Sequence, residues 1–490
     1  MKMTTLPTAK LMIDGQLRDA EGGKTFDIIG PWTGAPVGIA ADASAKDVDE
    51  AIAAARRAFD ETDWPTNVEK RVALVQKLYD LFDANRNRLS DLARFEAGAA
   101  VGAVGRAHVD MAMDGWRDYL AVFPQVRWET DYPPRMAYGF ESHRKALHEP
   151  VGVVGAITPW NVPLYVNVGK VVAALLAGCT VILKPAPNTP GMGAIFGELA
   201  IEAGFPAGVL NVVFGEDPAL AGEMLVTDPR VDLISFTGST GIGKHIMRQC
   251  AATMKRVFLE LGGKSAKIVL EDAPNFAMEI AQSMLVFHAG QGCAVQSRLL
   301  VHKSRYEEAK AILAHSYGSF GENWGDVDNP AHIMGPVVSK RQQGRVMSYI
   351  ELGQDEGATL IAGGKARPDK GNGYFIEPTC FADVHNDMRI AQEEIFGPVL
   401  VVIPFENDDD AVRIANDSDY GLGGGVVSAD LSRAMKIARR VRTGTMSVNG
   451  GMSISGDVPF GGYKASGIGR EWGVEGIEEY LETKLIAWRT

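Results

Sequence analysis

Helical spacing of apolar residues predicts the first elements of the chain. Ser44 is a suitable N-cap, and Asp47, three residues later, completes a capping box. The apolar positions that follow recur as on one helix face, at Val48, Ile52, Ala55 and Phe59. The same spacing continues in a second predicted helix, which starts after Pro65 and ends before Gly98.

From Val151 the pattern changes to short apolar runs that alternate with segments of helix length. The predicted strands are residues 151–157, 181–184, 210–214, 233–237 and 257–261. The predicted helices between them are residues 165–177, 193–203 and 240–252. Such alternation is typical of βαβ units around a parallel sheet, and strands that are apolar throughout are expected to be buried on both faces.

A second α/β region is predicted to start near Gly262. Its strands are expected at residues 267–270, 299–302, 399–404 and 445–448, and its helix at 276–288. Residues 128–147 alternate polar and aromatic side chains around two prolines, which favours an extended arm over a helix. We expect this arm to pair with residues 480–487 across a subunit boundary or to form a hairpin within the chain. The alternation of side chains is compatible with both.

The composition indicates an acidic globular protein. Lys and Arg number 49 and Asp and Glu 61, a net charge of −12. This balance argues against nucleic-acid binding and against a polybasic membrane anchor. The longest nearly apolar run, residues 171–183, is shorter than the roughly 20 residues that span a bilayer. Four scattered cysteines and nine dispersed histidines lead us to expect free thiols, a cytoplasmic location and no metal site.

Two glycine-containing segments are candidates for a nucleotide site. Residues 191–193 (GMG) follow turn-forming residues, which favours a simple helix start. Residues 236–243 (FTGSTGIG) directly follow an apolar strand, and small residues there let a phosphate approach the backbone N–H groups at a helix start.

Cys293 and Glu260 are the candidate reactive residues. A single cysteine is usually a small buried hydrophobe, but Cys293 lies among small and polar residues, where its thiol could face a cleft. Glu260 stands between two leucines at the end of an apolar strand, as either a salt-bridged structural group or a perturbed general base. A thiol and a carboxylate together suit covalent catalysis followed by hydrolysis.

Seven segments in order resemble the NAD(P)-dependent aldehyde dehydrogenase superfamily, along essentially the whole chain. They are residues 158–163 (TPWNVP), 183–187 (LKPAP), 236–240 (FTGST), 259–264 (LELGGK), 290–298 (GQGCAVQSR), 393–398 (EEIFGP) and 459–467 (PFGGYKASG). The resemblance implies an α/β fold with three parts. These are a Rossmann-like cofactor domain (1–127 and 148–260), a second α/β catalytic domain (261–470) and a small β oligomerisation arm (128–147 and 471–490).

The resemblance also implies a covalent oxidation of an aldehyde. Cys293 resembles the nucleophile that forms a thiohemiacetal, which hydride transfer to the nicotinamide converts to a thioester. The Asn161 side-chain amide and the Cys293 backbone N–H resemble the oxyanion hole. Glu260 resembles the base that activates water for thioester hydrolysis. Lys170 and Glu471 match a proton relay, with a helix-surface lysine and a first-turn glutamate as equally supported alternatives.

For the cofactor, Lys184 resembles the residue that binds the adenosine ribose, and Gly238 and Ser239 resemble the pyrophosphate contacts. Glu394 resembles the residue that holds the nicotinamide ribose. Phe396 is expected beside that ribose, or as a core aromatic, or both.

Two further positions in the cofactor motifs concern the choice between NAD and NADP. Trp160 is assigned to the cofactor site with the TPWNVP segment. Pro187 stands where many NAD-preferring relatives carry an acid that grips both ribose hydroxyls. Because an acid would repel a 2′-phosphate, its absence leads us to expect that NAD is used and NADP tolerated.

The substrate funnel is predicted to be roomy and apolar. Relatives that prefer small aldehydes line it with aromatic rings, whereas this chain has Val162, Gly169 and Ile454, with Phe460 as one aromatic. We therefore expect a bulky apolar or aromatic aldehyde as substrate and a homodimer or homotetramer as the assembly. The alternatives are a CoA-acylating semialdehyde dehydrogenase, which has less need of a base at Glu260, and a catalytically silent structural relative.

Overall fold

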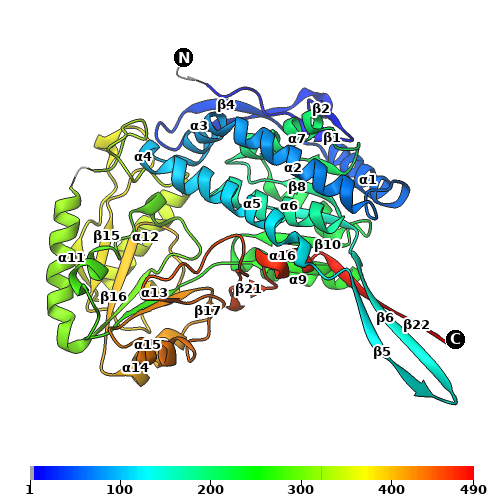
Figure 1. Cartoon of the computed structure of the whole chain (residues 1–490). Helices are drawn as coiled ribbons and strands as arrows, with labels where there is room; N and C mark the ends of the chain where they lie inside the picture. Colours follow the sequence, from blue (N-terminus) through cyan, green and yellow to red (C-terminus); the bar gives the residue numbers. More distant parts are fainter. Residues whose placement is uncertain (1–4, 322, 490) are drawn as a thin grey trace.

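The computed structural model of the protein describes residues 5–321 and 323–489. Two large sheets with helices around them lie side by side, and a narrow β-arm projects from the body next to the C-terminus (Figure 1). Among the described residues, no helix is both long enough and apolar enough to cross a membrane.

The first sheet contains the predicted βαβ units. Its strand order is β2-β1-β9-β8-β7-β10-β11-β21, and the strands from β9 to β11 run parallel. Their bounds are β1 (Leu11–Ile13), β2 (Gln16–Arg18), β7 (Val153–Ile157), β8 (Thr180–Lys184), β9 (Leu210–Val212), β10 (Leu233–Thr237), β11 (Arg256–Glu260) and β21 (Gly467–Ile468). Every residue of β7, β8, β9 and β10 is buried, as predicted for strands covered on both faces.

Helices cover both faces of the first sheet (Figure 1). One face contacts α1 (Ala45–Glu61), α8 (Pro218–Thr227) and α9 (Thr240–Cys250). The other contacts α6 (Pro163–Ala177) and α7 (Pro190–Ala203), which α2 (Val68–Ala84), α5 (Met111–Val122) and α16 (Gly473–Glu478) flank. The capping box predicted at the start of α1 is present, with Ser44 and Asp47 each satisfying the other's backbone.

The second predicted helix is in fact two. It breaks at Asn85 into α2 and α3 (Arg86–Ala97), and the short α4 (Val101–Val104) follows. Asn85 leaves helical geometry at φ −103° and ψ 16°, and its side-chain amide donates 2.8 Å to the Leu81 carbonyl at the end of α2. Gly98 ends α3 at φ 70°, a conformation that favours glycine.

The segment 191–193 is a helix start, as predicted. A carboxylate from another helix accepts hydrogen bonds from its free backbone N–H groups. Glu96, near the end of α3, accepts hydrogen bonds from the backbone N–H groups of Gly191 (2.6 Å) and Met192 (2.9 Å) at the start of α7. Burial raises the pKa of the Glu96 carboxyl to about 8, against the opposing effect of these two donors.

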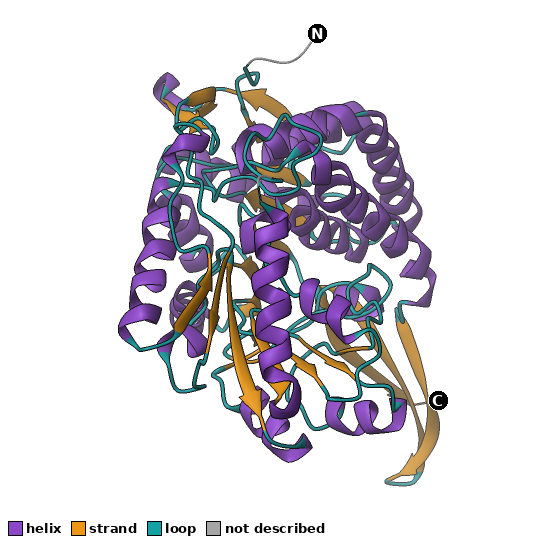
Figure 2. Cartoon of the chain, turned by 90° about the vertical axis from the view of Figure 1, so that its left-hand side faces the viewer, coloured by secondary structure: helices purple, strands orange, loops and turns teal. Residues whose placement is uncertain are grey.

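The second sheet has the order β14-β15-β16-β13-β12-β18-β19, and all pairs except β14–β15 are parallel. Its strands are β12 (Ala266–Val269), β13 (Arg298–His302), β14 (Thr359–Ala362), β15 (Thr379–Ala382), β16 (Val399–Phe405), β18 (Gly424–Val427) and β19 (Ser447–Val448). The helices of this part, several of which flank the strands in Figure 2, are α10 (Phe276–Ala281), α11 (Tyr306–Phe320), α12 (Lys340–Asp355), α13 (Arg389–Gln392), α14 (Asp408–Asn416) and α15 (Leu431–Ala438). Two smaller sheets pair β3 (Thr25–Ile29) with β4 (Pro36–Ala41), and β17 (Tyr420–Gly421) with β20 (Tyr463–Lys464).

Two sequence boundaries differ in the structure. The helix predicted at 276–288 ends at Ala281, and His288 and Ala289 have φ of 43° and 51°, which a right-handed helix cannot contain. Strand β21 lies within the predicted catalytic segment 261–470 but pairs with β11 of the first sheet. Gly467 permits this close approach, since a Cβ there would lie 1.9 Å from the Leu259 carbonyl oxygen. The division into domains stays a prediction.

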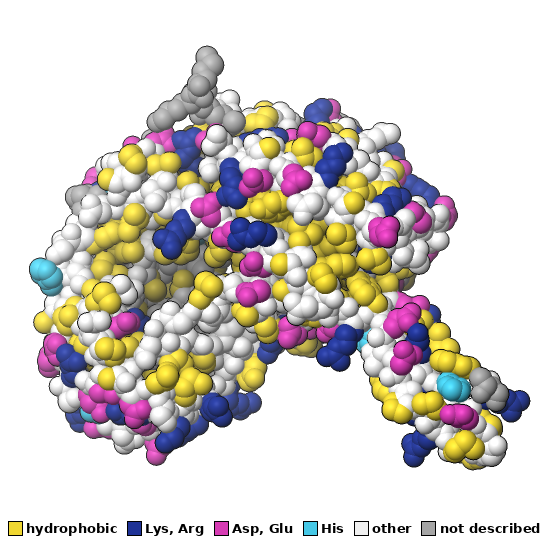
Figure 3. Space-filling view, viewed as in Figure 1, with side chains coloured by type: hydrophobic (Ala, Val, Ile, Leu, Met, Phe, Trp, Pro, Cys, Tyr) yellow, Lys and Arg dark blue, Asp and Glu magenta, His cyan; other side chains and the backbone are white. Residues whose placement is uncertain are grey.

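The arm is a three-stranded antiparallel sheet within the chain. Strands β5 (Glu129–Ala137) and β6 (Phe140–Pro150) form the hairpin, and β22 (Leu481–Arg489) pairs with β6 along its whole length. Hydrophobic side chains follow the projecting arm in Figure 3. Leu485, Ile486 and Trp488 of β22 are 61%, 42% and 44% exposed.

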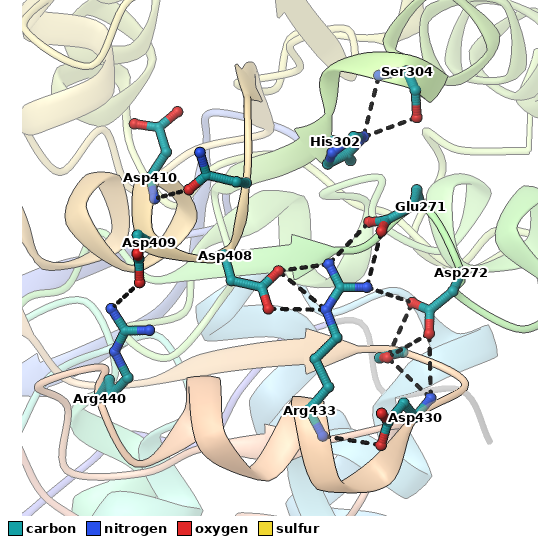
Figure 4. A network of polar contacts seen from close by, with 12 residues as sticks. Glu271, Asp272, His302, Ser304, Asp408, Asp409, Asp410, Asp430, Arg433 and Arg440 are labelled. Carbon is teal, nitrogen blue, oxygen red and sulfur yellow. Dashed lines mark hydrogen bonds and ion pairs between the residues drawn. The ribbon is translucent and has the colours of Figure 1, made fainter.

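A network of charges ties together the loops beyond β12, β16 and β18 (Figure 4). The guanidinium of Arg433 in α15 contacts Glu271 (2.9 Å), Asp408 (2.6 Å) and Asp272 (3.7 Å). Hydrogen bonds from Arg433 hold the pKa of Glu271 and of Asp408 below their ordinary values.

Candidate active site

Four strands of the first sheet end at one edge, and polar side chains follow each of them. The parallel register pairs Ile157 with Lys184 and Thr237 with Glu260, so these strand ends lie together. In parallel sheets, ligands bind outside the carboxyl ends of the strands. Three buried oxygens here have no hydrogen-bond partner among the described residues, namely Thr158 Oγ1, Thr237 Oγ1 and Glu260 Oε1. We take this edge as the candidate active site.

The loop that carries Cys293 is fixed by glycine and glutamine. Gly290 has φ 69°, and a Cβ there would lie 2.1 Å from the Gly397 carbonyl oxygen, so a larger residue does not fit. The Gln291 side chain donates to the His288 carbonyl (3.0 Å) and accepts from the Val338 N–H (2.9 Å). Sequence analysis missed this function of Gln291, although it lies in the segment that matched the family.

Asn161 is buried at the start of α6 and is tied to the cysteine loop. Its side-chain Nδ2 donates 3.0 Å to the Gln291 carbonyl, two residues before Cys293. An amide carries two N–H donors, so one remains for a ligand. The predicted place of Asn161 in an oxyanion hole is therefore compatible with its position.

Cys293 and Glu260 interact electrostatically. The thiol is only partly buried, whereas Glu260 is 2% exposed. Burial raises the pKa of the Cys293 thiol well above its ordinary value, and the charges of Glu260 and Glu394 add to this. Burial also raises the pKa of the Glu260 carboxyl, reinforced by Glu471 and opposed by Lys170 and by the Cys293 thiol. The direction of the Glu260 shift is compatible with the perturbed base that was one of the two predictions for this residue.

Lys170 and Glu471 form a buried ion pair. The Lys170 ammonium lies 2.5 Å from Glu471 Oε1, and the two side chains are 0% and 6% exposed. The ammonium also lies 4.6 Å from the centre of the Phe258 ring. Lys170 is buried, so the alternative of a helix-surface lysine is wrong, and Glu471 precedes the first residue of α16, so the alternative of a first-turn glutamate is wrong as well.

Tyr165 and Trp472 belong to the same cluster, and sequence analysis missed both. Their rings are 4.5 Å apart, and Tyr119 stacks on Trp472 at 4.8 Å. The indole also fills the space beside Gly169, where a Cβ would meet it at 3.2 Å. Gly169 therefore leaves no room in a substrate funnel, contrary to our expectation, because an aromatic ring from elsewhere in the chain occupies it.

Two of the predicted funnel residues pack against the apolar core of the first sheet. Val162 and Ile454 are partly buried and pack against the same apolar cluster as Cys293. Phe460 is 5% exposed, and its backbone pairs with that of Glu471, with 2.7 Å hydrogen bonds in both directions. Its visible function is to hold Glu471 in place.

The residues predicted for the nicotinamide ribose lie together. Glu394 Oε1 accepts 2.9 Å from the Gly263 N–H, and a Cβ at Gly262 would lie 2.3 Å from Glu394 Oε2. Burial raises the pKa of the Glu394 carboxyl, opposed by this N–H and by Lys264. Phe396 and Trp160 meet edge to face, with ring centres 5.4 Å apart.

The residues predicted for the adenosine half of the cofactor also fit a dinucleotide. Lys184 ends β8, and burial lowers the pKa of its amine to about 8. Pro187 follows, partly buried. Gly238 and the exposed Ser239 separate β10 from α9, whose N-cap is Ser239. The small residues and the helix start leave backbone donors near the unpartnered Thr237 hydroxyl, as a pyrophosphate requires.

Comparison with known proteins agrees with this geometry. Residues 17–486 match the model of the aldehyde dehydrogenase family. DhaS of Bacillus subtilis (strain 168) is 42% identical, over 98% of this chain and 95% of its own. The structure of a betaine aldehyde dehydrogenase mutant from Staphylococcus aureus with NAD+ is 35% identical, has a TM-score of 0.93 and covers 98% of this chain and 95% of its own. A mutant aldehyde dehydrogenase C from Pseudomonas syringae, in complex with NAD+ and octanal, is 37% identical, with a TM-score of 0.91 and coverages of 99% and 96%.

The chain belongs to the aldehyde dehydrogenase family, as the seven segments indicated. It has the fold of that family and is an NAD-dependent aldehyde dehydrogenase, so its substrate is an aldehyde.

Proposed function

We propose that the protein oxidises its aldehyde through a covalent adduct on Cys293, with Glu260 as the base. The observation that carries this proposal is the position of Glu260 at the ligand-binding edge of the first sheet, where its buried Oε1 has no hydrogen-bond partner among the described residues. A raised pKa makes Glu260 a stronger base near neutral pH. Glu260 then accepts the thiol proton while the thiolate sulfur attacks the aldehyde carbon.

The remaining residues act on the adduct and on the product. The carbonyl oxygen becomes an oxyanion, which accepts hydrogen bonds from the Asn161 amide and the Cys293 backbone N–H. Lys184, Ser239 and Glu394 would hold NAD, which would supply the hydride acceptor for the oxidation. In the hydrolytic step Glu260 takes a proton from water, the water oxygen attacks the thioester and the carbon–sulfur bond breaks. Lys170 and Glu471 provide the path by which protons leave the buried carboxyl, first the proton from the thiol, before hydrolysis begins, and then the proton from water.

NAD reduction at 340 nm across a panel of aldehydes, with and without CoA, tests this mechanism. We expect CoA-independent turnover in the wild type and none in Cys293→Ala, with NAD binding retained in the variant. Turnover only with CoA would favour the acylating alternative, and unchanged turnover in Cys293→Ala would refute the nucleophile. No turnover with any aldehyde would favour a catalytically silent relative.

We propose a bulky apolar or aromatic aldehyde as substrate. The support comes from the aliphatic side chains of Val162 and Ile454 beside the apolar cluster of Cys293. Gly169 no longer contributes, because Trp472 fills its space. We expect a higher kcat/KM for benzaldehyde and octanal than for acetaldehyde, and Ile454→Phe should reduce that preference. A higher kcat/KM for acetaldehyde in the wild type would contradict the proposal.

We also propose that NADP is tolerated. Pro187 offers no charge to repel a 2′-phosphate and no acceptor for the ribose hydroxyls. Pro187→Glu should therefore raise the NAD-to-NADP ratio of kcat/KM by about tenfold or more, which is roughly 1.4 kcal/mol or more. A wild-type ratio above about a thousand, roughly 4 kcal/mol, would show that another feature already excludes NADP.

Finally, we propose a cytoplasmic homodimer or homotetramer assembled through the arm. Within the described part of the chain, β5 and β22 are edge strands of the arm sheet, and such edges pair readily with another chain. The apolar side chains on β22 favour a covered surface. Light scattering after size exclusion tests this, and Leu485→Lys with Trp488→Lys should shift the mass towards one chain.

A further inference from the structure

The Tyr165 hydroxyl is a buried donor without an acceptor. The side chain is 8% exposed, and its oxygen has no hydrogen-bond partner among the described residues. The Trp472 indole N–H interacts weakly with that oxygen, outside hydrogen-bonding geometry. In that interaction the hydroxyl oxygen is the acceptor, so the O–H of Tyr165 still has no group to which it donates. Buried polar groups almost always have partners, so an exception near a reactive thiol suggests a function.

Helix α6 and the segment before α16 connect Tyr165 with the relay pair. Tyr165 stands in the first turn of α6, five residues before Lys170 of the same helix. Trp472, against which the Tyr165 ring packs, directly follows Glu471. Glu471 in turn pairs with Lys170, the ammonium of which lies over the Phe258 ring.

Strand β11 brings Glu260 to the same cluster. Phe258 and Glu260 are two residues apart in a strand, so their side chains point to the same face of the sheet. Lys170 of α6 contacts that face through Phe258. Glu260 Oε1 is a buried acceptor without a donor, and the Tyr165 O–H is a buried donor without an acceptor.

We propose that Tyr165 is a positioning residue for Glu260: its hydroxyl donates a hydrogen bond to the Glu260 carboxylate when that carboxylate activates water for thioester hydrolysis. This inference rests on the proposed hydrolytic function of Glu260. Both groups lack a partner among the described residues, and a bridging water can join two such groups where they do not touch directly. No covalent step is added, and the proton from water still passes to Glu260 and leaves through Lys170 and Glu471.

The charges around Glu260 make this donor useful. Glu471, before α16, and Glu394, after α13, disfavour its carboxylate form. Lys170 of α6 and the Cys293 thiol favour that form. Burial and the charges of Glu471, Cys293 and Glu260 keep the Tyr165 hydroxyl protonated by raising its pKa well above 10. Tyr165 is therefore a neutral donor at every working pH, able to stabilise the carboxylate without titrating itself.

The test is Tyr165→Phe, which removes the hydroxyl and keeps the ring on Trp472. Loss of a donor to a carboxylate raises the pKa of that carboxyl, so the acidic limb of the hydrolytic step should move to higher pH. We expect a shift of about one pH unit and roughly tenfold slower hydrolysis below the limb. Acylation should change little, so a burst of about one NADH per active site should precede the slow steady state.

A second readout needs no cofactor. An activated ester such as p-nitrophenyl acetate can acylate Cys293 directly, and its slow phase reports hydrolysis of the acyl-enzyme alone. The pH dependence of that slow phase should show the same displacement in Tyr165→Phe. A structural defect would lower the rate without displacing the limb.

Tyr119→Phe is the matched control. Tyr119 packs on the same indole, but its hydroxyl donates to the Gly169 carbonyl (3.2 Å) and accepts from the backbone N–H of Trp472 (2.9 Å). We expect Tyr119→Phe to lower the Tm and leave the pH limb in place. Tyr165→Phe should leave the Tm unchanged or raise it, because it removes an unpaired buried polar group.

The outcomes separate this inference from the proposed function. An active wild type with an unmoved pH limb in Tyr165→Phe would overturn the role of Tyr165 alone. A wild type that forms no acyl-enzyme with either an aldehyde or the ester would overturn the proposed mechanism instead. A limb that moves equally in both tyrosine variants would show a general effect of the aromatic cluster and would also overturn the inference.

Discussion

Replacement of Lys170 by Met should destabilise the protein strongly, because it leaves Glu471 buried without its counter-charge. The pair is 2.5 Å apart, with side chains 0% and 6% exposed, and Met keeps most of the volume of the lysine stem. Removing one partner of a buried ion pair costs about 3–5 kcal/mol. The loss of the cation over the Phe258 ring adds to this in the same direction.

The measurable consequence is a fall in Tm. At roughly 2–4 °C per kcal/mol for large domains, the expected decrease is about 6–20 °C in the transition that includes the first sheet. The double variant Lys170→Met with Glu471→Leu removes both charges and should regain most of the loss, since buried pairs replaced by apolar residues are often neutral.

An exposed ion pair supplies the control. Lys303 and Glu406 are 2.6 Å apart, with side chains 65% and 61% exposed. Lys303→Met should leave the Tm nearly unchanged, because solvent screens an exposed pair. The reasoning is refuted if the double variant at 170 and 471 is as unstable as the sum of the two single variants, because the pair would then have no coupling energy.

Three further predictions concern stability and the cysteine loop. The pKa of the Glu96 carboxyl is about 8 in the fold, above the ordinary 4.5 of a glutamate, so the folded state binds more protons between these values and the Tm should fall as pH rises through this range. Glu96→Gln should flatten that slope in differential scanning fluorimetry. Arg433→Met should lower the Tm by leaving three carboxylates without a shared cation, and added salt should recover part of the loss; no change at low salt would contradict the network in Figure 4. Gly290→Ala should lower turnover by more than tenfold, roughly 1.4 kcal/mol, with NAD affinity nearly unchanged in a binding titration, because a Cβ collides with the Gly397 carbonyl oxygen; wild-type turnover would contradict it.

The sequence predicted the parallel sheets well because their strands are apolar throughout. Strand β10 has the predicted bounds, and β7, β8, β9 and β11 differ by a few residues. The break at Asn85 was missed because apolar residues continue at helical spacing across it. A local side-chain hydrogen bond to the Leu81 carbonyl, rather than the apolar pattern, ends the helix there.

The sequence predicted the site residues that stand in recognisable motifs. It did not predict the contacts between segments that are far apart in the chain. Cys293, Glu260 and Asn161 stand in segments with recognisable composition. The packing of Trp472 against Gly169 joins positions far apart in the chain, and one sequence contains no signal for such a pair. The same holds for the unpartnered hydroxyl of Tyr165, which looks like one more apolar-face residue of α6.

The return of strand β21 to the first sheet has a consequence for biosynthesis. The ribosome makes the polypeptide from the N-terminus, and domains generally fold as they emerge. The ion-pair partner of Lys170 lies 301 residues further along the chain. On one side of Glu260, the neighbouring strand forms only when Gly467 has been made. The nascent chain therefore lacks the partner of Lys170 and the edge strand beside β11 until residues 467–471 have been made. We expect the reactive centre to complete its packing only after that point.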